Sequence, residues 1–399
     1  MKQRLLSIPD LPSLLYVGFV SYVVRWLETL AFALFAYQAT QSAFVVVMLT
    51  MLRLLPMGLF GAFIGSAAGR HDLRHALALV VGTSGLVTLV LAVLASGGWL
   101  SVWHLAVASF ISGICLATDN PVRRMMIGNI VGADRMGAAI SIDVGISNAS
   151  RVIGPLLAGA LLAQHGIASA LWLGVAACAT SLAAALRLAR RPPDAGAAGG
   201  FFVENMRQGL AWLRGDSRMV GLLVITIVFN IFGWPFTSLI PVVATDYFQL
   251  EPRGVGLLAS CEGIGGLVGS LLLAVMARPG WYGRIYAGAV GMYLVTMVGF
   301  ALVPSALAAG LMLMLNGISA VGFAVMQATL VYRGAPVEMR ARAMGVLSVC
   351  IGTSPLGFLY LGLLADILTP RDAMLAISAQ GALVLYLSRR YWRVVLQRD

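Results

Sequence analysis

Charged residues are scarce in this sequence. They make up 11% of its 399 residues and hydrophobic residues make up 60%, whereas a soluble domain carries about 25% charged residues. Lysine is almost absent, because Lys2 is the single lysine among 27 basic residues. This composition excludes a soluble globular protein and predicts an integral membrane protein. The net charge of +11 comes from arginines scattered between apolar blocks, which indicates membrane orientation and no nucleic-acid partner.

Motifs for metal binding and catalysis are also missing. No C-x-x-C pair occurs, and His71 and His75 have the i, i+4 spacing of a helical metal site without a third ligand. Neither a phosphate-binding glycine loop with lysine nor a nucleophile elbow is present. We therefore expect no metal, no cofactor and no enzymatic activity, with an ion gradient as the energy source. The cysteines, expected to be inert packing residues, are Cys115, Cys178, Cys261 and Cys350.

Long apolar blocks are what the sequence does contain. A bilayer core about 30 Å thick needs about 20 apolar residues per helix, and twelve such blocks are separated by glycine, proline or charge. They cover residues 12–37, 43–68, 75–97, 101–122, 137–164, 168–189, 218–244, 254–277, 285–304, 306–332, 341–366 and 372–389. The pattern predicts an all-α integral membrane protein with two pseudo-symmetric six-helix bundles.

The predicted bundles are joined by a polar stretch. The amino-terminal bundle covers 1–190 and the carboxy-terminal bundle covers 218–399, and the two halves share a Gly-Pro or Ser-Pro element in their fifth helices. Residues 191–217 hold a Pro/Gly/Ala linker followed by a segment that suits an amphipathic helix on the membrane surface. We expect this linker to be cytoplasmic.

Arginine distribution sets the predicted topology. The gaps after blocks two, four, six, eight and ten are rich in arginine, whereas alternate gaps such as 38–43 hold few basic residues or none. The positive-inside rule then places both termini in the cytoplasm, and we expect the protein in the bacterial inner membrane. A cleaved signal peptide is rejected, because the first apolar run continues past Arg25 to Tyr37.

Four segments carry a family resemblance. Residues 61–74 resemble the Gly-x-x-x-Asp-Arg-x-Gly-x-Arg motif after helix two of the major facilitator superfamily, with Gly69 where the family has aspartate. Residues 119–124, 150–159 and 336–345 are similar to its enterobactin-exporter-like and macrolide-efflux-like branch, the transmembrane secretion effector type. The resemblance implies a twelve-helix transporter. It assigns conformational gating to Arg70, Asp72, Arg74, Asp119, Arg123, Asp143, Gly154 and Pro155, with Asp72, Asp119 or Asp143 in place of the missing aspartate.

The Gly154-Pro155 element in predicted helix five bears on the direction of transport. In the family this pattern is associated with antiporters and exporters, which opposes a nutrient importer. Proline removes a backbone donor and small residues permit close helix approach. An ordinary kinked packing helix explains the same residue types, so both interpretations stay open.

Five ionisable residues are predicted to lie near mid-bilayer, where each costs about 2.5–3.5 kcal/mol on insertion scales. Arg25 and Glu28 share a helix face, and Glu28 and Arg53 lie at matching depths on either side of the first outer turn. We predict that Glu28 pairs with Arg53 or Arg25 in a central cavity and carries a proton when the pair opens. A permanent structural clasp is the alternative. The other two are Arg151, a candidate for binding an anion or for internal pairing, and Glu262, a second protonation candidate.

Uncharged polar residues complete the predicted substrate site. Asn230, Trp234, Asn316 and Gln327 fall on predicted helices seven and ten, where they either contact substrate or join helices. The predicted substrate-binding set is Arg25, Arg53, Arg151, Asn230, Trp234 and Gln327.

These features predict a monomeric secondary transporter. Its substrate is predicted to be a siderophore or similar acidic metabolite, exported by proton-coupled antiport with alternating access, because three arginines in the amino-terminal half favour an anion. A broad-specificity drug or macrolide pump, an importer, and a membrane scaffold without transport are the alternatives.

Overall fold

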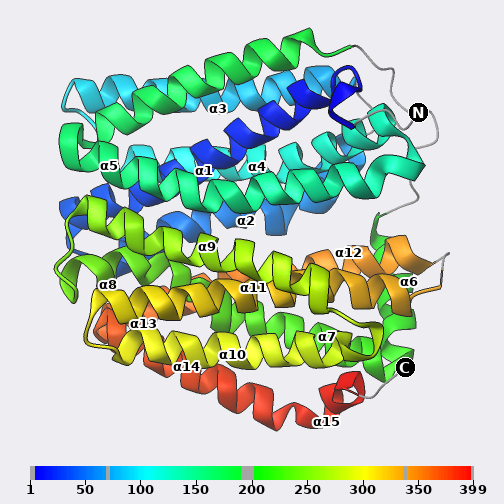
Figure 1. The fold of residues 1–399 in the computed structure, drawn as a ribbon. Coiled ribbons are helices and arrows are strands. Elements are labelled where there is room, and N and C mark those ends of the chain that lie inside the picture. The colour runs from blue at the N-terminus through cyan, green and yellow to red at the C-terminus, as the bar shows by residue number, and fades with distance from the viewer. Residues whose placement is uncertain (1–4, 69–71, 190–201, 337–338, 397–399) are drawn as a thin grey trace. The chain divides into compact units, whose positions relative to one another are not determined.

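The computed structural model describes residues 5–68, 72–189, 202–336 and 339–396 (Figure 1). These residues are mostly helical and contain no β-strand. The helices are α1 (Leu11–Thr40), α2 (Ala43–Ala68), α3 (Leu73–Ser96), α4 (Val102–Val131), α5 (Ala133–Arg187), α6 (Phe202–Gly215), α7 (Ser217–Val228), α8 (Ile240–Asp246), α9 (Pro252–Met276), α10 (Tyr282–Leu302), α11 (Ala306–Gly334), α12 (Arg340–Ile351), α13 (Ser354–Ile367), α14 (Pro370–Leu387) and α15 (Arg389–Trp392).

The predicted membrane-spanning fold is confirmed. Within the described residues, nine helical stretches are long and apolar enough to cross a bilayer. One of them, Arg135–Arg187, holds two crossings, because α5 reverses at Gly166 (φ 70°, ψ −175°), a conformation essentially restricted to glycine. Counting both arms of α5 and adding α2 and α14 gives the twelve crossings that the apolar blocks predict.

Two predicted helices are interrupted. Block 218–244 becomes α7, a π-helical turn at Phe229–Gly233, a 3₁₀ segment at Trp234–Leu239, and α8. Block 341–366 becomes α12 and α13, which meet just before Pro355. Proline cannot donate the helical hydrogen bond and its ring clashes with the preceding turn. Each break therefore follows from a proline that the continuous apolar pattern hides.

The chain forms two compact units. The first comprises Met1–Ala39, Leu52–Gly199 and Glu251–Ser260, and the second comprises Thr40–Met51, Gly200–Leu250 and Cys261–Asp399. In the second unit, α6 packs against α12. This helix falls within the predicted amphipathic segment, while residues 190–201 of the predicted linker lie outside the described part of the chain.

Small residues set the helix spacing in the first unit. A Cβ added at Gly113 of α4 would lie 2.2 Å from the carbonyl oxygen of Arg53 in α2, and one at Gly154 of α5 would lie 2.5 Å from Trp26 Cβ in α1. Both values are far below van der Waals contact. The four helices therefore approach closely because these positions are glycine, and their polar side chains are brought within hydrogen-bonding distance.

Candidate functional site: a buried charge network in the first unit

Glu28 of α1 and Arg53 of α2 form a buried ion pair. Arg53 Nη2 donates to Glu28 Oε2 at 2.9 Å, and both side chains are 7% exposed. Thr88 of α3 donates to Glu28 Oε1 at 2.8 Å, while Arg53 Nη1 donates to Thr29 Oγ1 at 2.7 Å and to the Arg25 carbonyl oxygen at 3.0 Å. Of the two partners predicted for Glu28, the structure selects Arg53. The pair is fully hydrogen bonded, which a buried ion pair requires.

Arg25 and Arg151 gather around Trp26. The guanidinium carbon of Arg25 lies 5.3 Å from the Trp26 ring centroid and that of Arg151 lies 4.9 Å from it. Arg25 also lies 5.1 Å from the Tyr22 ring, and no carboxylate forms an ion pair with it among the described residues. An arginine stacked on an aromatic ring keeps its N–H groups available as hydrogen-bond donors, because they point outward in the plane of the guanidinium group. This arrangement of two cations and an indole suits an anionic, partly aromatic ligand.

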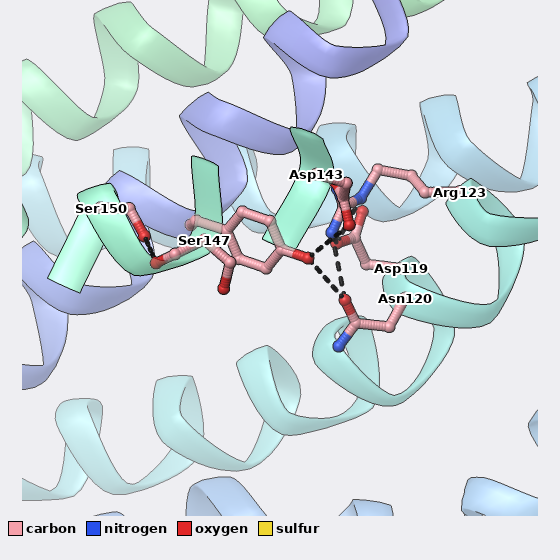
Figure 2. Close-up of polar contacts among 7 residues, drawn as sticks. Asp119, Asn120, Arg123, Asp143, Ser147 and Ser150 are labelled. Atoms are coloured by element: carbon pink, nitrogen blue, oxygen red, sulfur yellow. Dashed lines mark hydrogen bonds and ion pairs between the residues drawn. The ribbon is translucent and has the colours of Figure 1, made fainter. Parts of the chain in front are cut away.

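A second network surrounds Arg123 of α4, which is 1% exposed. Its Nε donates to Asp119 Oδ2 at 2.9 Å, its Nη1 to Asp143 Oδ1 at 2.7 Å and its Nη2 to Asn120 Oδ1 at 3.1 Å (Figure 2). The Tyr22 hydroxyl lies 3.2 Å from both Asp143 Oδ2 and Asn120 Oδ1. We call Tyr22, Asp119, Asn120, Arg123 and Asp143 the Arg123 cluster. It joins α1, α4 and α5 and holds two carboxylates for one guanidinium.

A cavity of about 60 Å³ lies beside both networks. Its wall includes Glu28 and Arg53 at one level and Tyr22 and Asp119 at another. The remaining polar lining comes from Arg25 and from Ser21, Ser84, Ser112, Cys115, Cys178 and Ser181. The cavity therefore lies inside the first unit, and helices α1 to α5 all contribute to its wall.

The other predicted gating residues lie away from this cavity. Asp72 caps α3 by accepting from the Arg74 backbone N–H at 2.9 Å, and its second oxygen pairs with His75. The Arg74 side chain donates to the Leu186 carbonyl oxygen. Arg70 lies outside the described residues. Of the three aspartates proposed to replace the missing family residue, Asp119 and Asp143 are brought together, and Asp72 is held elsewhere.

The predicted Gly154-Pro155 element occupies the first arm of α5. Gly154 contacts α1, and the Pro155 carbonyl oxygen faces Gly256 in the first turns of α9, which belong to the first unit. An added Cβ at Gly256 would lie 2.5 Å from that oxygen. The element therefore permits backbone contact on two sides of α5.

The predicted amide residues of the second unit bond to other groups inside that unit. Asn230 Nδ2 donates to the Thr226 carbonyl oxygen at 2.8 Å, and Gln327 Nε2 donates to Thr226 Oγ1 at 3.0 Å. Asn316 bonds to Thr296. Trp234 is partly exposed and packs edge-on against Phe358 at 6.0 Å between centroids, while Glu262 of α9 is 7% exposed.

Sequence reasoning missed several members of the networks. Tyr22, Trp26, Thr88 and Asn120 are uncharged, and a search for ionisable residues in apolar blocks passes over them. Asn120 follows Asp119 directly, and Tyr22 and Trp26 flank Arg25, so a search for polar and aromatic residues beside a buried charge finds three of the four. Thr88 carries no such signal.

Comparison with known proteins identifies the family. The profile of the Major Facilitator Superfamily matches residues 14–359. Macrolide efflux protein A of Streptococcus pyogenes is 23% identical over 264 residues, which are 65% of this chain, and the chain spans 64% of that protein's length. The staphyloferrin A transporter of Staphylococcus aureus is 23% identical over 363 residues, covering 88% of each chain.

A solved structure agrees at the level of the fold. The bacterial homologue of the human lysosomal transporter Spinster has a TM-score of 0.70 and 16% sequence identity, and the match covers 98% of each chain. The resemblance seen in the four sequence segments is thus confirmed by a match across most of the chain. The protein belongs to the major facilitator superfamily and is a multi-pass membrane protein with the fold of that family.

Proposed function

We propose that the protein exports a small acidic metabolite, such as a siderophore, from the bacterial cytoplasm in exchange for protons. It does so as a monomer in the inner membrane, with both termini in the cytoplasm. The observation that carries the proposal is the placement of the Glu28–Arg53 ion pair in the same cavity wall as Arg25, next to the Arg25–Trp26–Arg151 stack. Efflux is the activity in the name of the macrolide relative, and staphyloferrin A is the substance in the name of the other relative.

Glu28 is the proposed proton carrier. Protonation removes its charge and weakens the bond to Arg53, which also holds the Arg25 carbonyl oxygen and Thr29 of α1. The proton thereby changes the position of α1, the helix that carries Arg25 and Trp26. Arg25 and Trp26 are in position to bind substrate only while Glu28 is ionised. Binding of substrate and binding of a proton therefore exclude each other, which is the condition for antiport. Glu262 stays the second proposed protonation site.

The proposed substrate contacts are the cations of the first unit. Arg25 and Arg151 bind the anionic groups and Trp26 stacks on an aromatic group such as a catechol. Arg53 contributes positive charge near Arg25. In the second unit Trp234 is the proposed substrate contact. The side-chain amides of Asn230 and Gln327 instead donate hydrogen bonds to Thr226 inside the unit.

A binding experiment in lipid nanodiscs tests the coupling. We expect the affinity of a catecholate siderophore to fall as the pH is lowered, because protonated Glu28 and bound substrate exclude each other. In Glu28→Gln this pH dependence should disappear. Affinity that rises on acidification would indicate co-transport of proton and anion, and an unchanged pH dependence in Glu28→Gln would remove Glu28 as the carrier.

A broad-specificity drug pump is the second candidate, favoured by the macrolide efflux relative and by the aromatic residues beside Arg25. Uptake into everted vesicles separates the two. Export of an acidic metabolite predicts that Arg25→Ala and Arg151→Ala each abolish uptake of a catecholate siderophore. A drug pump predicts uptake of erythromycin that survives both substitutions.

A further inference from the structure

Two residues in the wall of the first-unit cavity each carry a buried polar atom that no protein group satisfies. Asp119 Oδ1 and Ser181 Oγ are buried and have no hydrogen-bond partner, and both residues line the cavity. An unsatisfied buried polar group costs about 1–3 kcal/mol, so these atoms indicate a polar occupant. Because one water needs roughly 10–15 Å³, the cavity has room for about four. The serines from α1, α3, α4 and α5 in its wall supply the two to four polar partners that each buried water needs.

We propose that this cavity is a proton path on which Asp119 passes protons to Glu28 through ordered water. The inference rests on the proposed role of Glu28 and adds a second carboxylate to it. Both carboxylates line the cavity. Tyr22, the member of the Arg123 cluster on α1, precedes Glu28 by six residues. The Arg123 cluster and Glu28 are therefore about 9 Å apart along the axis of α1. Two or three waters at the usual spacing of about 2.8 Å span that distance.

Asp119 is better suited than Asp143 to accept the proton. Asp143 uses both oxygens, for Arg123 and Tyr22, whereas Asp119 uses only Oδ2, for Arg123. A proton on Asp119 Oδ1 therefore breaks no existing bond. It also balances the charge of the Arg123 cluster, which holds two carboxylates and one guanidinium. The step moves one proton from the Asp119 carboxyl group to water and delivers one from water to the Glu28 carboxylate.

The surroundings of Asp119 come from all five helices. The charged and titratable groups that face Asp119 or the cavity are Tyr22, Arg25 and Glu28 of α1, Arg53 of α2, Cys115 and Arg123 of α4, and Asp143 and Cys178 of α5. Helix α3 contributes the hydroxyl of Ser84 and no charge. Asp119 and Glu28 are thus the two carboxylates of the lining, and each is paired with an arginine.

Infrared spectroscopy of the full-length protein in lipid tests the path without a substrate. After a rapid drop in pH, the absorbance of the carbonyl band of protonated carboxyl groups increases with time. The part of this increase that is missing in the Glu28→Gln variant is assigned to Glu28. Asp119→Asn removes the donor but keeps the Arg123–Asp143 bond. Ser181→Val fills the cavity without touching a carboxylate. Ser150→Ala is the matched control, since Ser150 is buried, bonds to the Ser147 carbonyl oxygen and is outside the cavity lining (Figure 2).

We expect the Glu28 band to reach the same height in both variants but to grow more slowly. The expected slowing is at least about a hundredfold in Asp119→Asn, as for a missing acid–base group, and at least about tenfold in Ser181→Val, which only interrupts the water chain. Ser150→Ala should match the unmodified protein. Growth at the unmodified rate in both variants would overturn the path and leave the role of Glu28 standing. A spectrum with no Glu28-dependent band would remove Glu28 as the proton carrier and the path with it. If Asp119→Asn does not fold, Ser181→Val alone decides between the first two outcomes.

Discussion

The two units bury polar side chains in different ways. The first unit places three carboxylates and two arginines in its interior: Glu28, Arg53, Asp119, Arg123 and Asp143. Each carboxylate bonds to an arginine, and two of the three pairs join different helices. In the described part of the second unit, the buried polar side chains are amides and hydroxyls, with Glu262 as the one buried charge.

The polar interiors of the two units therefore differ in how they respond to protonation. A buried carboxylate beside an arginine changes its charge and its bonds when it takes a proton. The Thr226–Tyr286–Gln327 network of the second unit consists of groups that do not change charge near neutral pH. We therefore expect proton-dependent behaviour to originate mainly in the first unit. Apart from Glu262 and Trp234, we expect the polar residues of the second unit to respond to mutation mainly through stability.

Removal of the Arg123 guanidinium should give the largest effect. Arg123→Met leaves two buried carboxylates uncompensated, which should lower the free energy of unfolding by about 3–5 kcal/mol. Thermal unfolding in detergent micelles measures this. As a control, Arg123→Met combined with Asp119→Asn and Asp143→Asn should recover much of the loss, because no unpaired charge remains. A single variant as stable as the unmodified protein would mean that the cluster is not a charge-balanced unit.

Removal of the Thr88 hydroxyl should have a smaller effect, confined to Glu28. Thr88→Val takes away the hydrogen bond to Glu28 Oε1, and a bond to a charged group contributes about 1.5–3 kcal/mol. We expect that loss in thermal unfolding, together with a shift in the pH dependence of siderophore binding. Thr88→Ser keeps the hydroxyl and should behave as the unmodified protein. A shift of equal size in both variants would mean that the hydroxyl is not its cause, because Thr88→Ser keeps the hydroxyl.

The fold was accessible from sequence because its main signal is local. Twelve apolar blocks, arginine-rich gaps and the charges inside the blocks each appear as a run or a spacing along the chain. Local geometry also narrowed the partner of Glu28 to Arg53 or Arg25, since Glu28 and Arg53 stand at similar distances from one tight turn and Arg25 shares a helix face with Glu28. The break at Gly166 was also visible, as the gap between two blocks.

The polar contacts between helices and the cavity could not be predicted, because they produce no periodic pattern in the sequence. Tyr22 and Asp143 meet across 121 positions, and Arg123 joins them only because α1, α4 and α5 pack closely. The cavity between Glu28 and Asp119 is a property of the packed bundle. The π-helical turn at Phe229–Gly233 is hidden in an apolar run whose composition suits a continuous helix. Apolar pattern fixes which residues cross the membrane and leaves open which polar side chains meet inside.

A substitution in the second unit should give the smallest effect and sharpens the comparison most directly. Gln327→Met keeps an unbranched side chain of similar length but removes the donor to Thr226 Oγ1, which should cost about 1 kcal/mol of stability. Uptake of a catecholate siderophore into everted vesicles should stay within about twofold, a change equivalent to less than 1 kcal/mol. Met326→Leu, on the same helix, controls for packing alone. A hydrogen bond that only joins helices affects folding and transport together. A loss of uptake much larger than the loss of stability would therefore assign Gln327 to substrate binding and show that this residue of the second unit takes part in recognition.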